Sequence, residues 1–240
     1  MLDFNHNLYL EEFNFKDTAE LRETPSLNRG DVPTSEQISG IEVRLSKAHI
    51  IDNKTKPFGP FPGLAKVYFM NIIISDISAS QLALNLDGFE KVDDNQQLSV
   101  DRTLFYWKKV KKADKAPSQI HVMSSLIKSK QALRNTADIL AKAKDNSDYK
   151  NLAGKLGTLL KNTASVTNVS SMVFEMAGII GKLLGKVDDK PLLTRFQSFT
   201  DVAGNFNQLG KTDHPFKNRY AEVDFSIYIR DKTRQEESDT

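Results

Sequence analysis

The sequence predicts an α+β protein in which an antiparallel, β-sandwich-like domain carries a helical insertion before its C-terminal strand. Apolar and polar residues alternate with period two over 41–46 and again over 221–230, which is typical of strands with one buried face. Between these segments, over about 119–187, apolar residues recur at every third or fourth position, as they do on amphipathic helices. The expected architecture is therefore a β-domain interrupted by helices.

The N-terminal half is predicted to be a meander of strands. A Pro- and Gly-containing stretch over 16–40 indicates a long surface connection. The nearly continuous apolar run over 66–75 favours a central strand that is covered on both faces. Strands are predicted, in order, over 8–15, 41–51, 66–75, 82–86 and 98–107.

The middle of the chain is predicted to be helical, with three or four helices. A first helix is expected over about 118–144, and Ser147-Asp148 is expected to cap a second one. A third helix is expected over about 165–186, where three glycines permit close packing against another helix.

The C-terminal part is predicted to return to strand. Residues 192–199 fit a strand, with a helix left open as an alternative, and 201–218 is predicted to be a long loop. The segment 220–230 is expected to pair with the early strands, which would thread the helices into one domain. The expected organisation is a strand and connection over 1–40, a β-domain made of 41–112 and 191–231, a helical insertion over 113–190 and a polar tail over 232–240.

Composition and motifs exclude several classes of function. The 33 basic and 31 acidic residues nearly balance, so no general field attracts nucleic acid, and no nucleic-acid partner is expected. The chain has no cysteine, which excludes disulfides, thiolate zinc sites and cysteine nucleophiles. Phosphate-loop, nucleophile-elbow and H-E-x-x-H motifs are absent, and the four histidines are scattered. No catalytic or cofactor-binding residue is therefore nominated.

The start of the chain lacks the basic flank and apolar run of a secretory leader, and no segment has the roughly 18–20 apolar residues of a spanning helix. These observations predict a soluble, cytoplasmic protein and leave leaderless secretion open.

Aspartates at the ends of predicted strands and in the late loop are weak candidates for calcium ligands, because calcium takes six to eight oxygens from such loops. The dense D-x-D pairing of strong calcium sites is missing, and aspartates also occur at turns because they cap the backbone. The candidates are Asp87, Asp93, Asp94 and Asp201.

Two features are candidates for an interface. The lysine run after the strand at 98–107 could meet an anionic partner or membrane, or could be a solvated connector. The third helix is apolar around more than half of its circumference, so neighbouring helices, a protein partner or a bilayer must cover it. The nominated interface residues are Lys108, Lys109, Lys111, Lys112, Val173, Ile180 and Leu184.

These patterns together predict a non-enzymatic interaction protein. The β-domain would be the scaffold, and the helical insertion would bind a protein partner or a second copy in a larger assembly. One alternative is a membrane-acting toxin or effector whose amphipathic helices engage a bilayer. A second alternative is a hydrolase whose site no motif reveals.

Overall fold

The apolar run at 66–75 lies at the centre of the molecule. In the computed structural model of the chain it forms β3 (Ala65–Ser75), and both faces of this strand are buried. Val67 and Phe69 belong to one hydrophobic core, whereas Tyr68 and Met70 belong to a second core on the opposite face. This follows from strand geometry, because successive side chains point to opposite faces. A strand without a polar face must be covered on both sides, as the sequence predicts.

The structure describes residues 8–10, 38–58, 63–77, 82–129, 136–161, 166–183, 190–201 and 203–231. The other strands are β1 (Leu8–Leu10), β2 (Ile38–Ile50), β4 (Leu82–Val92), β5 (Gln96–Leu98), β6 (Arg102–Lys108), β7 (Gln119–Ser129), β8 (Lys190–Thr200), β9 (Gly210–Lys217) and β10 (Ala221–Asp231). The helices are α2 (Thr136–Asp145), α3 (Ser147–Lys161) and α4 (Val166–Leu183). Most of the connection predicted over 16–40 and all of the tail predicted over 232–240 lie outside the described residues.

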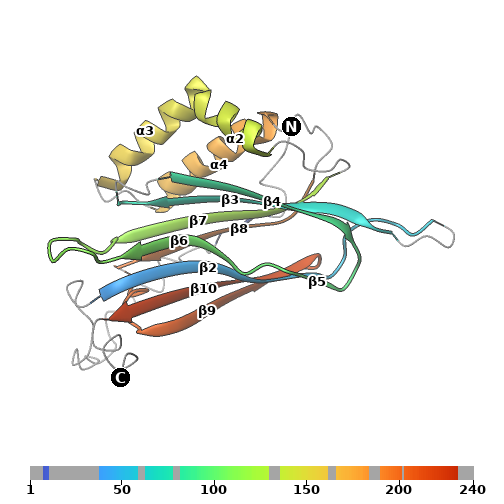
Figure 1. Cartoon of the computed structure of the whole chain (residues 1–240). Helices are drawn as coiled ribbons and strands as arrows, with labels where there is room; N and C mark the ends of the chain where they lie inside the picture. The colour runs from blue at the N-terminus through green and yellow to red at the C-terminus, as the bar shows by residue number, and fades with distance from the viewer. Residues whose placement is uncertain are drawn as a thin grey trace.

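The strands form two sheets, and nearly all neighbours are antiparallel. The first, called here the helix-side sheet, has the order β1-β8-β7-β3-β4, and only its β1–β8 pair is parallel. The second, called here the outer sheet, has the order β5-β2-β10-β9, with β6 also paired to β2. Figure 1 shows the two sheets stacked, with the helices on one side of the stack. One hydrophobic core contains residues of both sheets, so their facing sides bury each other.

The pairing of β10 with β2 confirms the prediction that the last strand joins the early ones. The register runs from Ala221 opposite Ile50 to Asp231 opposite Ile38. On β10 the residues Val223 and Phe225 are buried in the core between the sheets.

The helices cover the other face of β3 and its neighbours. Ile72 and Met123 of the helix-side sheet share a core with Leu152 of α3 and with Val173 and Ile180 of α4. Asn146 caps α3, since its Oδ1 accepts a hydrogen bond from the Tyr149 N–H at 3.0 Å. The predicted cap at Ser147-Asp148 is therefore wrong by one residue. None of the helices that the structure describes is long and apolar enough to cross a bilayer.

The helix predicted over 118–144 is wrong at its N-terminal end. Residues 119–129 form β7, which is hydrogen-bonded between β3 and β8, and the helical part within the described residues begins at Thr136. The boundary of the insertion at 113 is too early for the same reason. Because β7 is buried on both faces, it shows no polar alternation, and its apolar residues happen to fall at spacings of three and four.

The loop predicted over 201–218 is wrong as well, because β9 occupies its second half. β9 pairs with β10 at the edge of the outer sheet, and its side chains alternate between exposed and half-buried. Its inward residues include Thr212 and His214, so the alternation does not appear as hydrophobic periodicity. Within the described residues, three strands therefore follow the helices, whereas the sequence predicted two, over 192–199 and 220–230.

We predict that Ile180→Ala lowers the free energy of unfolding by about 2–5 kcal/mol, because it leaves a cavity between α4 and the helix-side sheet. Ile180 is fully buried. Urea denaturation monitored by circular dichroism measures the change. Glu175→Ala on the exposed face of α4 is the control, and we expect a change within about 0.5 kcal/mol. Equal stability of the two variants would contradict the helix–sheet core.

Candidate functional site

A cavity of about 630 Å³ opens beside β4, where the edges of the two sheets meet. Both sheets contribute to its wall. Leu86 and Phe89 come from β4, Val67 comes from β3, and Val100 and Arg102 come from the β5–β6 region. The wall therefore combines apolar side chains with charged ones, which is the usual make-up of a binding site.

An ion pair joins the two sheets at this cavity. Arg102 of β6 pairs with Asp87 of β4, and its second guanidinium nitrogen donates a hydrogen bond to Asn85 Oδ1 at 3.3 Å. Burial raises the pKa of Asp87, and the positive charge of Arg102 opposes this shift. The pair thus holds a partly desolvated carboxylate in the cavity wall and ties the edge of one sheet to the edge of the other.

A row of polar residues runs from this ion pair through the core between the sheets. Asn85 lies opposite Asn71, Asn71 lies opposite Ser124, and Ser124 lies opposite Arg195 on successive strands. Asn71 and Ser124 are fully buried, and Ser124 Oγ donates a hydrogen bond to Asn71 Oδ1 at 2.6 Å. Asn71 Nδ2 has no acceptor among the described residues, although an unsatisfied buried donor costs about 1–3 kcal/mol. The row is therefore a costly polar feature of an otherwise apolar core.

Arg195 ends this row on β8 and is only 2% exposed. Its guanidinium donates hydrogen bonds to Gln197 Oε1 and to the His214 carbonyl oxygen, the latter at 2.7 Å. It also lies 5.4 Å from the ring centroids of Phe216 and Phe225, where cation–π attraction is favourable. Arg195 therefore connects the helix-side sheet to β9 and β10.

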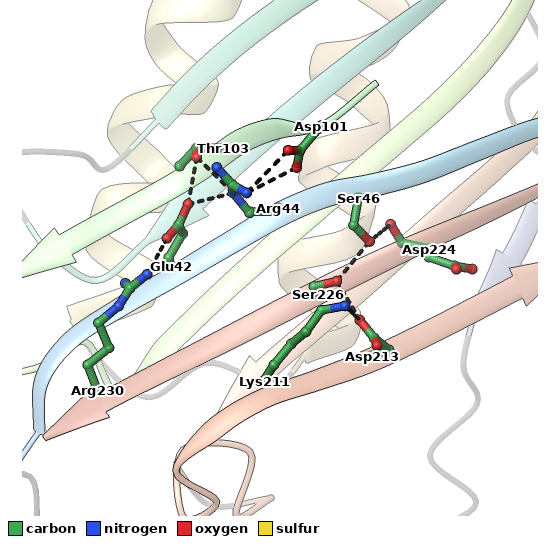
Figure 2. Close-up of polar contacts among 10 residues, drawn as sticks. All are labelled: Glu42, Arg44, Ser46, Asp101, Thr103, Lys211, Asp213, Asp224, Ser226 and Arg230. Atoms are coloured by element: carbon green, nitrogen blue, oxygen red, sulfur yellow. Dashed lines mark hydrogen bonds and ion pairs between the residues drawn. The ribbon is translucent and has the colours of Figure 1, made fainter. Parts of the chain in front are cut away.

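The exposed face of the outer sheet carries a network of ion pairs around Glu42 (Figure 2). Glu42 pairs with Arg44 at 2.7 Å and with Arg230 at 2.8 Å, and it accepts a hydrogen bond from Thr103 at 2.7 Å. Burial opposes ionisation of Glu42, but the hydrogen bonds from Arg230 and Thr103 and the charge of Arg44 outweigh it, so the pKa of Glu42 is lowered. All of these groups satisfy one another, which favours a structural role.

A second polar chain continues on β10 and β9 (Figure 2). Ser226 Oγ donates to Asp213 Oδ1 at 2.5 Å, and Lys211 pairs with the same carboxylate at 2.9 Å. These hydrogen bonds, that of Ser226 foremost, lower the pKa of Asp213. Neighbouring Asp224 is different, because burial raises its pKa and its Oδ1 has no partner among the described residues.

His121 and Ser198 lie as close together as a catalytic base and its nucleophile, but the distance is the only feature that they share with such a pair. His121 Nδ1 lies 2.8 Å from Ser198 Oγ, and Nε2 lies 3.1 Å from Gln119 Oε1. Gln119 in turn donates to the Leu160 carbonyl oxygen of α3 at 2.9 Å. Neither His121 nor Ser198 lines the cavity beside β4 or the smaller one near Lys211, so the pair has no substrate space there. We interpret it as a polar tie between the sheet and the helices.

The structure separates the predicted calcium ligands. Asp87 is paired with Arg102, whereas Asp94 lies in the turn after β4 and accepts a hydrogen bond from the Asn53 N–H at 2.7 Å. Asp93 is in the same turn, and Asp201 lies at the end of β8, three strands away from β4 in the sheet. Among the residues that the structure describes, no three acidic or histidine side chains are arranged so that they could hold a metal ion.

The predicted interface residues fall into two groups. Val173 and Ile180 are covered by the chain's own helix-side sheet, and Leu184 lies outside the described residues. The lysines instead lie at the end of β6 and in the loop after it, where Lys108, Lys111 and Lys112 are exposed and Lys109 is half-buried.

Sequence reasoning missed the polar row and the open edge of β4. Asn71 was the available signal, because it is the one amide inside the apolar run of β3.

No protein-family model matches the chain, and neither does any curated protein. The interpretation of the site therefore depends on its geometry.

Acid should weaken the fold through His121. Burial lowers its pKa to about 4 from the ordinary value of 6.5, with the charge of Asp76 opposing the shift. Below pH 6.5 the unfolded chain therefore binds a proton that the folded chain excludes, so stability is lost as the pH falls toward 4, by about 3 kcal/mol in total. Urea denaturation over this pH range should show that the His121→Gln variant loses less free energy of unfolding than the unmodified protein does. An equal loss in the two proteins would contradict the assignment of the acid sensitivity to His121.

Removing the charge of Arg102 should move the titration of Asp87. Because Arg102 opposes the effect of burial, Arg102→Gln should raise the pKa of the Asp87 carboxyl further. NMR titration of the side-chain carboxyl carbon measures this pKa. An unchanged pKa would mean that the ion pair does not persist in solution.

Proposed function

We propose that this chain is a non-enzymatic interaction protein that assembles with a second copy of itself through the edge of β4. The observation that carries the proposal is that β4 is an edge strand of eleven residues. Within the part of the chain that the structure describes, no strand lies on its outer side. Such an edge presents a row of main-chain donors and acceptors that pair with another extended strand.

The other sheet edges are protected against strand addition, whereas the Leu82–Phe89 part of β4 is not. The charges of Glu90 and Lys91 lie only at the C-terminal end of β4. β9 has Pro215 and three charged residues, β1 and β5 have three residues each, and β6 has a cation at each end. From Leu82 to Phe89, β4 has no proline and one charge, Asp87, which Arg102 of the same chain neutralises. Charges and prolines are the usual protection of an edge, so their scarcity here favours pairing.

The sequence of β4 suits antiparallel pairing with itself. Leu82, Leu84 and Leu86 lie on the face toward the helices and are only half-buried. A two-fold axis at Leu84 would place this residue opposite its copy and Leu82 opposite Leu86 of the second copy. The leucines would then bury one another, and no like charges would face each other. The two helix-side sheets would become one continuous sheet.

The proposal also includes a β-sandwich-like arrangement with the helices as its insertion. The core shared by both sheets and the position of α2–α4 between β7 and β8 support it. The contact is placed on the β-domain, and not on the helices, because Val173 and Ile180 are already covered.

Cysteine crosslinking tests the register. The chain has no cysteine, so Leu84→Cys introduces a single thiol. In the proposed dimer the two Cβ atoms would lie about 4.5–5.5 Å apart, and a short thiol-specific crosslinker should join the two chains rapidly. Sedimentation of the unmodified protein should give twice the mass of the 27.0 kDa chain.

Glu90→Cys, on the exposed part of the same strand, is the control. Its two thiols would lie about 40 Å apart in this register, so crosslinking should be slow. Equal crosslinking of the two variants, or a monomeric mass of the unmodified protein, would show that the proposal is wrong. The mass measurement decides the matter even if Leu84→Cys fails to fold.

A further inference from the structure

We infer that the loop between β6 and β7, with the lysine that ends β6, binds the surface of an anionic lipid bilayer. This segment, residues 108–118, contains five lysines, one aspartate and no arginine. Val110 stands among the lysines and is 81% exposed. A large apolar side chain that is exposed between cations is typical of loops that touch a membrane interface.

Hydrogen bonds give this loop a defined shape. Asp114 Oδ2 accepts hydrogen bonds from the Val110 N–H at 3.0 Å and from the Lys111 N–H at 2.7 Å. The Asp114 N–H donates to the Lys111 carbonyl oxygen at 3.0 Å, and the Lys109 N–H donates to the Ser39 carbonyl oxygen at 2.9 Å. The loop is therefore closed on itself and anchored to β2.

The same hydrogen bonds occupy the only acidic side chain of the segment. Those from Lys111 and Val110 lower the pKa of Asp114, which keeps the carboxylate ionised and directed at the loop backbone. The side chains of Lys111, Lys112 and Lys115 are exposed. Positive charge and the Val110 side chain are thus what the loop presents to its surroundings.

The loop is placed where a flat surface can reach it. It projects past the ends of the strands, at the left of the molecule in Figure 1. On the outer sheet, the end of β6 lies near the end of β10, since Lys108 and Arg230 are both opposite Gly40 of β2. The loop therefore adjoins the ends of two strands of the outer sheet.

The chemistry favours lipid over other anionic partners. The lysine ammonium is a point charge, whereas the planar guanidinium of arginine binds one phosphate or carboxylate through two parallel hydrogen bonds. A run of lysines therefore suits a diffuse negative surface. On the phosphate backbone of a nucleic acid, Val110 would find no apolar group to contact. In a bilayer, its side chain can enter the boundary between the headgroups and the acyl chains. An acidic polypeptide remains the alternative that the experiment must separate.

The experiment measures binding of the full chain to vesicles by co-sedimentation. We expect binding to vesicles of phosphatidylcholine mixed with phosphatidylserine and little binding to phosphatidylcholine alone. Because each lysine contributes about a fivefold factor in affinity, the double variant Lys111→Gln with Lys112→Gln should bind about 25-fold more weakly. Val110→Asp should weaken binding as well, and raising the salt to about 1 M should abolish it.

The matched control removes the same amount of positive charge from the helical layer and leaves the loop unchanged. Lys144 and Lys155 are exposed on α2 and α3, so Lys144→Gln with Lys155→Gln should bind as the unmodified protein does. Equal weakening in both double variants, equal binding to both kinds of vesicle, or no binding by the unmodified protein would overturn the inference. So would poly-glutamate that binds the loop as tightly as the anionic vesicles do. None of these outcomes depends on whether the chain dimerises through β4.

Discussion

The architecture depends on the burial of β3 on both faces. Val67, Phe69 and Ile73 need the outer sheet as cover. Tyr68, Met70 and Ile72, on the opposite face, need the helices. Each fully buried large side chain contributes roughly 1.5–3 kcal/mol, so exposing either face would cost an amount comparable to the net stability of an ordinary domain. The outer sheet and the helical layer are thus the cover that this apolar strand requires.

The row of polar residues crosses the core between the two sheets, where the burial of polar groups costs free energy. Asn71 interrupts the apolar face of β3 toward the outer sheet, and its neighbours Ser124 and Arg195 continue the row across the helix-side sheet. Arg195 keeps its charge in the core because Gln197 and a β9 carbonyl accept its hydrogen bonds. At the other end the row reaches Asn85 and Arg102, where it meets the open cavity. The feature therefore connects the buried centre of the molecule to the rim at β4.

The surfaces available for contact are those that the core does not use. The apolar face of α4 is occupied by the sheet, and the exposed face of the outer sheet is neutralised by its own ion pairs around Glu42. Among the residues that the structure describes, two surfaces that the core leaves open are the main-chain edge of β4 and the lysine loop after β6. They differ in chemistry, since one offers hydrogen bonds and leucines and the other offers positive charge, so they can act independently.

The sequence by itself determined the elements whose signal is local. β3 followed from an unbroken apolar run, β2 and β10 followed from period-two alternation, and α3 and α4 followed from helical spacing. Only the tertiary structure decided that 119–129 is a strand, because its hydrogen bonds go to β3 and β8 and no local period encodes them. The same holds for β9, whose pairing with β10 stabilises residues that resemble a loop. The meeting of Asp87 with Arg102 and the position of Arg195 are also tertiary, because they depend on which strands become neighbours.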